Sequence, residues 1–411
     1  MKKILFGKFA RDSVFTMIGL VAMNGVAQFV VYPFLREIFG AEDYGKILSM
    51  LGVVNIIAVS VGTSLNNARL VAKTKGIGKD NKPYNIFLLI VTFVGLLLSF
   101  GVFAFLKETI TISSLLLYWA LMTMTIIRYY SDVEYRLNTN YSGLLIYYLV
   151  ISVGYLVGML LVKGTGCWAF GLLTGEVAGF AFVSLKGALY RKSPQINDQS
   201  VGDLWKSGRY LVVAQLLVNI IFNSDRIILM AFCSGSAVTV FYIASAVGKM
   251  ISFVTASFNS VIIGYLAKKE ESLSLKFFYK IVIASVVGVF AVSGLCYLGS
   301  IIYTKLLYPE DFIQTQQYFY PANLAQIFFF VSGIFTTILL RYEKEKMQTI
   351  INIFYVAVFC GVAIGLTYKF GVWGYIIGIL ISNFLRYVIS ILLCAKALKK
   401  RSVSNVYFPE N

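Results

Sequence analysis

The chain has 411 residues, of which 58% are hydrophobic and only 13% are charged, and its mean hydropathy is +0.78. Soluble domains carry about 25% charged residues, so this composition excludes a soluble globular protein. Apolar runs close to the roughly 20 residues that cross a bilayer recur from end to end. The sequence therefore predicts an all-α polytopic membrane protein.

The first apolar run follows a basic N-terminus, as in a signal peptide. The opening residues are MKKILFGKFARDSVFTMIGLVAM, but the run continues to Phe34 without a small-residue cleavage site. An uncleaved first span is therefore predicted. The twelve predicted spans are residues 13–36, 45–67, 84–106, 112–130, 142–162, 166–187, 207–230, 237–266, 278–304, 317–340, 347–368 and 371–395.

The loops between these spans differ in charge. A net charge of +17 would suggest nucleic-acid binding in a soluble protein, but most of the basic residues fall in alternate loops. The other loops hold Arg36, Lys46, Lys107, Lys163, Lys305 and Lys369. Because basic flanks stay in the cytoplasm, both termini are predicted to be cytoplasmic, and no nucleic-acid partner is expected.

The longest polar interruption, YRKSPQINDQSVGDLWKSG, separates the sixth span from the seventh. The predicted parts are an N-terminal six-helix lobe (1–190), a cytoplasmic linker (191–206), and a C-terminal six-helix lobe with a basic cytoplasmic tail (207–411). An even number of spans in each half predicts a parallel repeat, which aligns Asn24 and Gln28 with Asn219 and Asn223. Transporters built from repeats bind substrate between the halves, near the midplane.

Most familiar enzyme chemistry is missing from the sequence. Histidine is absent, which removes the commonest general base and many metal sites. The cysteines stand singly, and no phosphate-binding loop or nucleophile elbow occurs. We therefore expect no catalytic residues, no metal and no cofactor.

Ionisable residues inside spans are functional candidates, because their burial is costly. They are Glu176 in the sixth span, Asp225 and Arg226 in the seventh, Lys249 in the eighth and Arg386 in the twelfth. Arg69 and Arg128 lie at the predicted cytoplasmic ends of the second and fourth spans.

Helical spacing extends this set with polar stripes. Asn24, Gln28 and Tyr32 are predicted to share one face of the first span. Stripes are also predicted along the seventh (Gln215, Asn219, Asn223, Arg226), eighth (Ser245, Lys249, Ser252, Asn259) and twelfth spans (Asn383, Arg386, Tyr387). The stripes predict a hydrated central cavity lined by Asn24, Gln28, Arg69, Arg128, Asn219, Asn223, Arg226, Lys249, Asn259 and Arg386. Hydrogen bonding between helices is the alternative interpretation.

The segment NIIFNSDRIILMAF (219–232) places two adjacent charges in an apolar run. Arg226 continues the polar stripe, while Asp225 lies about 100° around the helix, where Lys249 or Arg386 could pair with it. In the alternative interpretation, the side chains of Asp225 and Arg226 both extend to the outer membrane interface and do not face a cavity. The buried set is cationic on balance, which favours an anionic substrate.

Several segments carry a resemblance to a known family. YPFLREIFGAEDYGKI (32–47) resembles the first outer loop of polysaccharide transport proteins, the Wzx-like flippases, with Phe39–Gly40 followed by the turn Asp43–Tyr44–Gly45. GTSLNNARLVAK (62–73) resembles the end of the family's second span. NSDRIILMAF followed by VTVFYIASAVGK resembles its junction between the seventh and eighth spans.

The resemblance implies the fold of the multidrug/oligosaccharidyl-lipid/polysaccharide superfamily, with two six-helix lobes around a cavity, in the inner (cytoplasmic) membrane of a bacterium. It also implies a flippase that moves a polyprenyl-diphosphate-linked oligosaccharide, an O-antigen or capsule repeat unit, to the outer leaflet. A proton or Na⁺ would drive the cycle, with Glu176 or Asp225 as coupling acids. Polymerase or chain-length proteins of the same pathway are possible partners.

Two other functions remain open at this point. An ion-coupled drug or metabolite antiporter of the same fold would favour a more acidic or aromatic cavity. A membrane glycosyltransferase or polymerase would need a sizeable outer loop with catalytic residues, and the sequence has neither.

Overall fold

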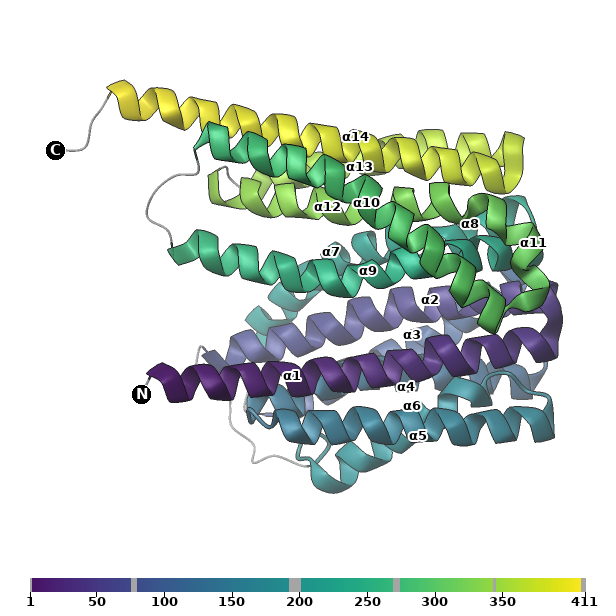
Figure 1. The fold of residues 1–411 in the computed structure, drawn as a ribbon. Coiled ribbons are helices and arrows are strands. Elements are labelled where there is room, and N and C mark those ends of the chain that lie inside the picture. The colour runs from purple at the N-terminus through teal and green to yellow at the C-terminus, as the bar shows by residue number, and fades with distance from the viewer. Residues whose placement is uncertain (1, 75–79, 192–200, 269–273, 343–344, 408–411) are drawn as a thin grey trace. The chain divides into compact units, whose positions relative to one another are not determined.

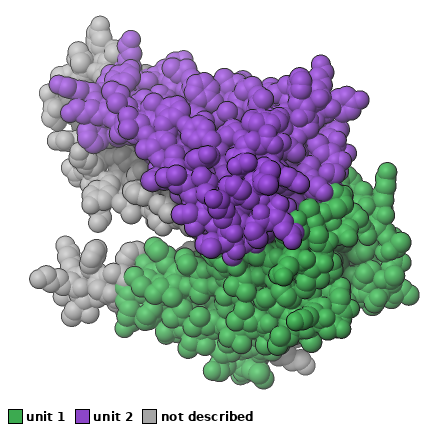
Figure 2. Space-filling model, turned by 45° about the vertical axis from the view of Figure 1, so that its right-hand side comes forward, with its two compact units in different colours: residues 1–227 green, residues 228–411 purple. Residues whose placement is uncertain are grey.

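The computed structural model describes residues 2–74, 80–191, 201–268, 274–342 and 345–407, and most of these residues are helical, with no strand among them. The chain forms two compact units, unit 1 (residues 1–227) and unit 2 (residues 228–411) (Figure 2). This division falls after the predicted linker at 191–206, because α7 packs against α2 in unit 1. The lobe boundaries that the sequence suggests stay a prediction.

The helices follow one another with few irregular residues (Figure 1). From the N-terminus they are α1 (Lys2–Val26), the π-helix η1 (Ala27–Val31), α2 (Tyr32–Thr74), α3 (Lys82–Leu106), α4 (Ile112–Leu137), α5 (Tyr141–Thr165), α6 (Phe170–Lys186), α7 (Val201–Phe222) and α8 (Ser224–Phe232). They continue with α9 (Gly235–Lys268), α10 (Leu275–Leu307), the 3₁₀ turn η2 (Pro309–Asp311), α11 (Phe312–Thr315), the 3₁₀ turn η3 (Gln316–Tyr318), α12 (Phe319–Tyr342), α13 (Glu345–Val358), the π-helix η4 (Phe359–Ala363) and α14 (Ile364–Tyr407).

Helices cover each of the twelve predicted spans. Among the described residues, seven helical segments are long and apolar enough to cross a membrane, or eight if the broken pair α7–α8 is one span. Two of these segments, Arg11–Lys73 and Ile350–Lys399, contain a sharp turn. The turns lie at Gly40 (φ 74°) and Gly371 (φ 57°), in backbone conformations that favour glycine. Twelve crossings stay a prediction.

Several helices leave long apolar faces uncovered. On α3 the side chains of Leu89, Phe93 and Leu97 are exposed, and on α10 those of Ile283 and Val287. Water-soluble monomers rarely expose contiguous apolar patches of this kind. Lipid is the solvent that suits these faces, and the chain is a multi-pass membrane protein.

In unit 2, Asn323 ties three helices together. Its side-chain amide bonds to both the N–H of Gly248 (2.6 Å) and the carbonyl of Ala244 (3.1 Å), the two groups that an unbroken α9 joins to each other. The same amide donates to the Ser300 hydroxyl of α10 at 3.0 Å. A Cβ at Gly248 would lie 2.5 Å from the Asn323 oxygen, so only glycine admits this contact.

Replacement of Asn323 by alanine is expected to destabilise unit 2 by about 2 to 4 kcal/mol, because it leaves several buried polar groups without a partner. The measurement is the thermal midpoint of unfolding of the purified protein. Asn383→Ala is the matched control, because the Asn383 amide donates one hydrogen bond, to Ala325 O. Equal midpoints for the two variants would contradict the role assigned to Asn323.

Candidate functional site

An ion pair lies inside unit 1, between α4 and α6. The Nε of Arg128 lies 2.9 Å from Oε1 of Glu176, and both side chains are almost fully buried. Tyr155 of α5 donates its hydroxyl to the same carboxylate oxygen at 2.8 Å, and the guanidinium lies 4.0 Å above the ring of Tyr129. The pair meets the requirement that buried charges be matched and hydrogen-bonded.

Close packing of α5 on α6 brings this carboxylate into place. A Cβ on Gly154 would lie 2.5 Å from the Cα of Gly175, so the backbones touch where both helices have glycine. Small residues allow such contacts between membrane helices. Tyr155 and Glu176 follow these glycines directly in the sequence, and the contact sets their side chains within hydrogen-bonding distance.

The sequence places Arg128 at the cytoplasmic end of the fourth span, and this placement stays a prediction. Helix α4 continues to Leu137, more than two turns beyond Arg128. The arginine therefore lies well inside the helix, because the polar residues that follow it remain helical. The sequence analysis assigned Arg128 to the cavity lining and Glu176 to ion coupling, whereas in the structure the two side chains form one ion pair.

Arg226 is buried beside α2 in the same unit. Its Nη1 donates to Leu48 O at 3.3 Å, and Ser49 donates its hydroxyl to Arg226 O at 3.0 Å. Tyr32, which begins α2, is buried near Arg226, Arg128 and Glu176. These side chains together form what we term the inner charge cluster of unit 1: Tyr32, Arg128, Tyr155, Glu176 and Arg226.

The predicted stripe on the seventh span is interrupted, because α7 ends at Phe222 and α8 begins at Ser224. Asn223 lies at this break and donates to Asn219 O, and Asn219 donates to the Ser60 hydroxyl of α2, both at 3.0 Å. Asp225 is buried in the first turn of α8, where the helix dipole stabilises a negative charge. Its predicted pairing with Lys249 or Arg386 stays a prediction.

The stripe on the first span is also altered. Residues 27–31 form a π-helix, whose i→i+5 hydrogen bonds change the angle between successive side chains. The shared face of Asn24, Gln28 and Tyr32 was predicted for an ideal α-helix, and for this segment it stays a prediction. Asn24 donates to Leu20 O of its own helix at 2.8 Å, Gln28 is half-buried, and Tyr32 is buried.

Arg69 belongs to a separate network at the opposite end of α2 from the turn at Gly40. It donates to the Tyr130 hydroxyl and, at 2.5 Å, to Asn81 Oδ1, and its guanidinium lies 4.7 Å from the centre of the Tyr84 ring. Asn81 in turn donates to Ala188 O at 2.8 Å. The sequence assigns the end of α2, the start of α3 and the end of α6 to the same cytoplasmic side, and these hydrogen bonds bring them together.

Asp132 is a buried charge that the sequence analysis missed. Its Oδ2 accepts a hydrogen bond from the Tyr148 hydroxyl at 2.8 Å and lies 4.0 Å from Arg136. The fourth span was predicted to end before this residue. The i, i+4 spacing from Arg128 through Asp132 to Arg136 was the signal that all three share a helix face.

In unit 2, two candidate cations lie over aromatic rings. Lys249 Nζ is 5.8 Å from the centre of the Phe241 ring. The Arg386 guanidinium is 4.5 Å from Phe329 and 5.1 Å from Tyr355, and it makes no ion pair with any residue that the structure describes. The side chain of Asn259 lies outside the described residues.

Other members of the twelfth-span stripe bond to neighbouring helices. Asn383 donates to Ala325 O of α12 at 2.8 Å, and the hydroxyls of Tyr387 and Ser285 of α10 are 2.6 Å apart. These contacts match the alternative interpretation, hydrogen bonding between helices. Within the described parts of the chain, no group of three metal-ligating side chains occurs.

Solved structures with the same fold are transporters and a flippase. A multidrug resistance MATE family transporter of the MOP superfamily, in an inward-facing conformation, matches with a TM-score of 0.64 and 16% identity over 94% of this chain and 99% of that chain. The lipid II flippase MurJ, inward closed, matches with a TM-score of 0.70 and 13% identity over 94% of this chain and 87% of its own. The Vibrio cholerae MATE transporter VcmN, in its bent form, has a TM-score of 0.57 and 15% identity over 99% of both chains.

No protein-family model and no curated protein matches the sequence. The chain thus has the membrane-transporter fold that the MATE transporters and MurJ share. At identities this low the likeness concerns the fold.

The replacement Glu176→Ala leaves Arg128 buried without its carboxylate, so we expect a loss of about 3 to 5 kcal/mol in the free energy of unfolding. The double variant Arg128→Met, Glu176→Leu removes both charges and is expected to recover most of that loss. Denaturant unfolding of the purified proteins measures both. Asp43→Asn breaks a pair with Lys46 in which the carboxylate is 60% exposed, and should change stability by less than about 1 kcal/mol. A Glu176→Ala protein as stable as Asp43→Asn would contradict the assignment.

Proposed function

We propose that the protein is a flippase that moves a polyprenyl-diphosphate-linked oligosaccharide from the cytoplasmic to the outer leaflet of a bacterial inner membrane. The proposal includes twelve crossings and cytoplasmic termini. It rests on the fold, which the lipid II flippase MurJ shares, and on the resemblance of residues 32–47 to Wzx-like flippases. The oligosaccharide hydroxyls and the diphosphate cannot cross hydrocarbon alone, because each buried polar group without a partner costs several kcal/mol.

The observation that carries the proposal is the environment of Arg386. Its neighbours Phe329 and Tyr355 present ring faces. Ring faces attract the cation, but they are not conventional hydrogen-bond acceptors for its N–H groups. No described carboxylate neutralises it. An arginine in this state offers a planar fork of donors to a diphosphate, which binds such forks in bidentate fashion.

The inner charge cluster of unit 1 suits a second task in the same cycle. Glu176 already accepts hydrogen bonds from Arg128 and Tyr155, so protonation of its carboxylate would release Arg128 for other partners. A proton that binds here would change the charge of the cluster by one unit. We therefore propose Glu176 as the coupling acid, with Asp225 as the alternative.

The second candidate function is an ion-coupled drug or metabolite antiporter. It is favoured by the buried carboxylates of Asp132, Glu176 and Asp225 and by the similar MATE transporters. Such a protein would move a small cation and would not need Arg386 to be positive. The two functions therefore differ in the substrate that crosses and in their dependence on this one charge.

Arg386→Ala is expected to lower the rate of flipping by about tenfold or more, because a charge-assisted contact to the diphosphate is lost. The measurement uses purified protein in vesicles that contain a polyprenyl-diphosphate oligosaccharide, with the outward-facing glycan cleaved by an added glycosidase. Lys305→Ala is the control, because Lys305 also lies over an aromatic ring, 4.9 Å from Phe312, and should flip normally.

Flipping by Arg386→Ala at the wild-type rate would overturn the role of this arginine. If wild-type vesicles flip no lipid-linked oligosaccharide but take up a small organic cation against a proton gradient, the antiporter function replaces the flippase.

A further inference from the structure

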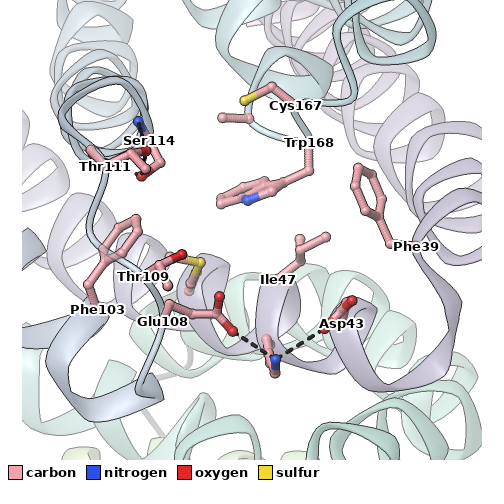
Figure 3. Close-up of a pocket in the computed structure, with 13 residues that line it drawn as sticks. Phe39, Asp43, Ile47, Phe103, Glu108, Thr109, Thr111, Ser114, Cys167 and Trp168 are labelled. Atoms are coloured by element: carbon pink, nitrogen blue, oxygen red, sulfur yellow. Dashed lines mark hydrogen bonds and ion pairs between the residues drawn. The ribbon is translucent and has the colours of Figure 1, made fainter.

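A pocket of about 280 Å³ lies at one end of unit 1, where three helix connections meet (Figure 3). Its walls come from residues 39–50, 103–114 and 167–169. The sequence assigns all three connections to the outer side of the membrane. The volume is near the lower end of the range of small-molecule sites, about 300 to 1,000 Å³, and suits a ligand no larger than one sugar ring with its substituents.

Left-handed residues shape the walls of this pocket. Gly40, Lys107 and Gly166 have φ values of 74°, 53° and 70°, and each turns the chain at this end of the unit. Tyr44 is fully buried and anchors the helix that follows Gly40. The turns thus place Phe39, Asp43 and Lys46 on one side and Trp168 on the other.

Trp168 is the central side chain of the pocket. Its indole ring extends across the pocket between the α2 wall and the start of α4 (Figure 3). The ring is only half-buried, and no acceptor among the described residues takes a hydrogen bond from its N–H. A half-exposed indole offers a flat apolar face and one polar donor to a ligand.

A charged group closes the floor of the pocket. Lys46 lies between Glu108 and Asp43, with Nζ 2.7 Å from one carboxylate and 3.1 Å from the other. Each carboxylate uses one oxygen for the lysine, and the second oxygen has no bond to a described residue. In Figure 3 the second oxygen of Glu108 is turned away from Lys46, toward the indole. The Thr109 hydroxyl, also in the lining, is exposed.

We propose that this pocket binds a sugar ring. The ring's C–H face would stack on the Trp168 indole, and its hydroxyls would donate to the second oxygens of Asp43 and Glu108. Two carboxylates against one lysine disfavour a phosphate. Lys46 already occupies the place that a ligand cation would take between the carboxylates. A neutral ligand with an apolar face and many hydroxyls fits both constraints.

This inference rests on the proposed function in one respect, since it assigns the pocket to a sugar of the same lipid-linked oligosaccharide. The pocket would hold the glycan once it reaches the outer side, while Arg386 would bind the diphosphate. Sugar binding itself is independent of transport, and the two can be measured separately.

The experiment measures binding of free saccharides by saturation-transfer NMR to the full chain in nanodiscs, which avoids sugar-headed detergents. The probes are glucose, galactose, rhamnose, N-acetylglucosamine, N-acetylgalactosamine and glucuronic acid. We expect at least one to bind, and Trp168→Ala to weaken it by about tenfold or more, as loss of an aromatic stacking platform does. Trp168→Phe should retain part of the affinity. Trp373→Ala removes a partly exposed tryptophan elsewhere and should bind as wild type.

Each outcome separates the two proposals. If no probe binds while the protein still flips the lipid-linked oligosaccharide, the pocket inference falls and the flippase stands. If a probe binds through Trp168 but no flipping occurs, the pocket stands and the proposed function falls. Trp168-dependent binding of tetramethylammonium without any saccharide would make this a cation site and overturn the inference. Saccharide binding unaffected by Trp168→Ala would overturn it as well.

Discussion

Arg128 is a guanidinium buried in a bundle surrounded by lipid, and it finds its counter-charge within unit 1. Arg128 of α4 meets Glu176 of α6 at 2.9 Å, and α5 and α6 touch at Gly154 and Gly175, next to the Tyr155 that bonds to the same carboxylate. Low local dielectric strengthens the pair and makes a single unmatched charge expensive. The register of three helices is therefore linked to one ion pair.

The two units surround their arginine side chains differently. In unit 1, Arg128 has a carboxylate, and Arg69 has the oxygens of Tyr130 and Asn81. In unit 2, Arg386 has aromatic faces and no described carboxylate. A cation over ring faces keeps its charge without a partner carboxylate, whereas the charge of Arg128 is neutralised by Glu176. The difference suits a division between ion coupling in unit 1 and anion binding in unit 2.

Hydropathy and loop charge predict where helices run, because every membrane span must be long and apolar. They do not predict departures from ideal helix geometry. The π-helix at 27–31 lies just before Pro33, which has no N–H to bond to Phe29 O, and the break at Asn223 has no glycine or proline. Asn-Ser-Asp at 223–225 does suit a helix start. Because the flanking residues are apolar, the sequence instead predicted one continuous span across them. The role of Asn323 was not predicted, because it depends on Gly248, which is far away in the sequence.

Residues 32–47, which carry the resemblance, form one wall of the pocket in unit 1. Gly40 takes a left-handed conformation, Tyr44 is fully buried, and Phe39, Asp43 and Lys46 line the pocket beneath Trp168. Gly40 and Tyr44 are needed to form the turn, whereas Asp43 is not. Turn geometry explains a glycine and a buried tyrosine. Asp43 pairs with Lys46 through a carboxylate that is 60% exposed, and it lines the same pocket as an indole with an unused donor, so the proposed sugar could use both groups.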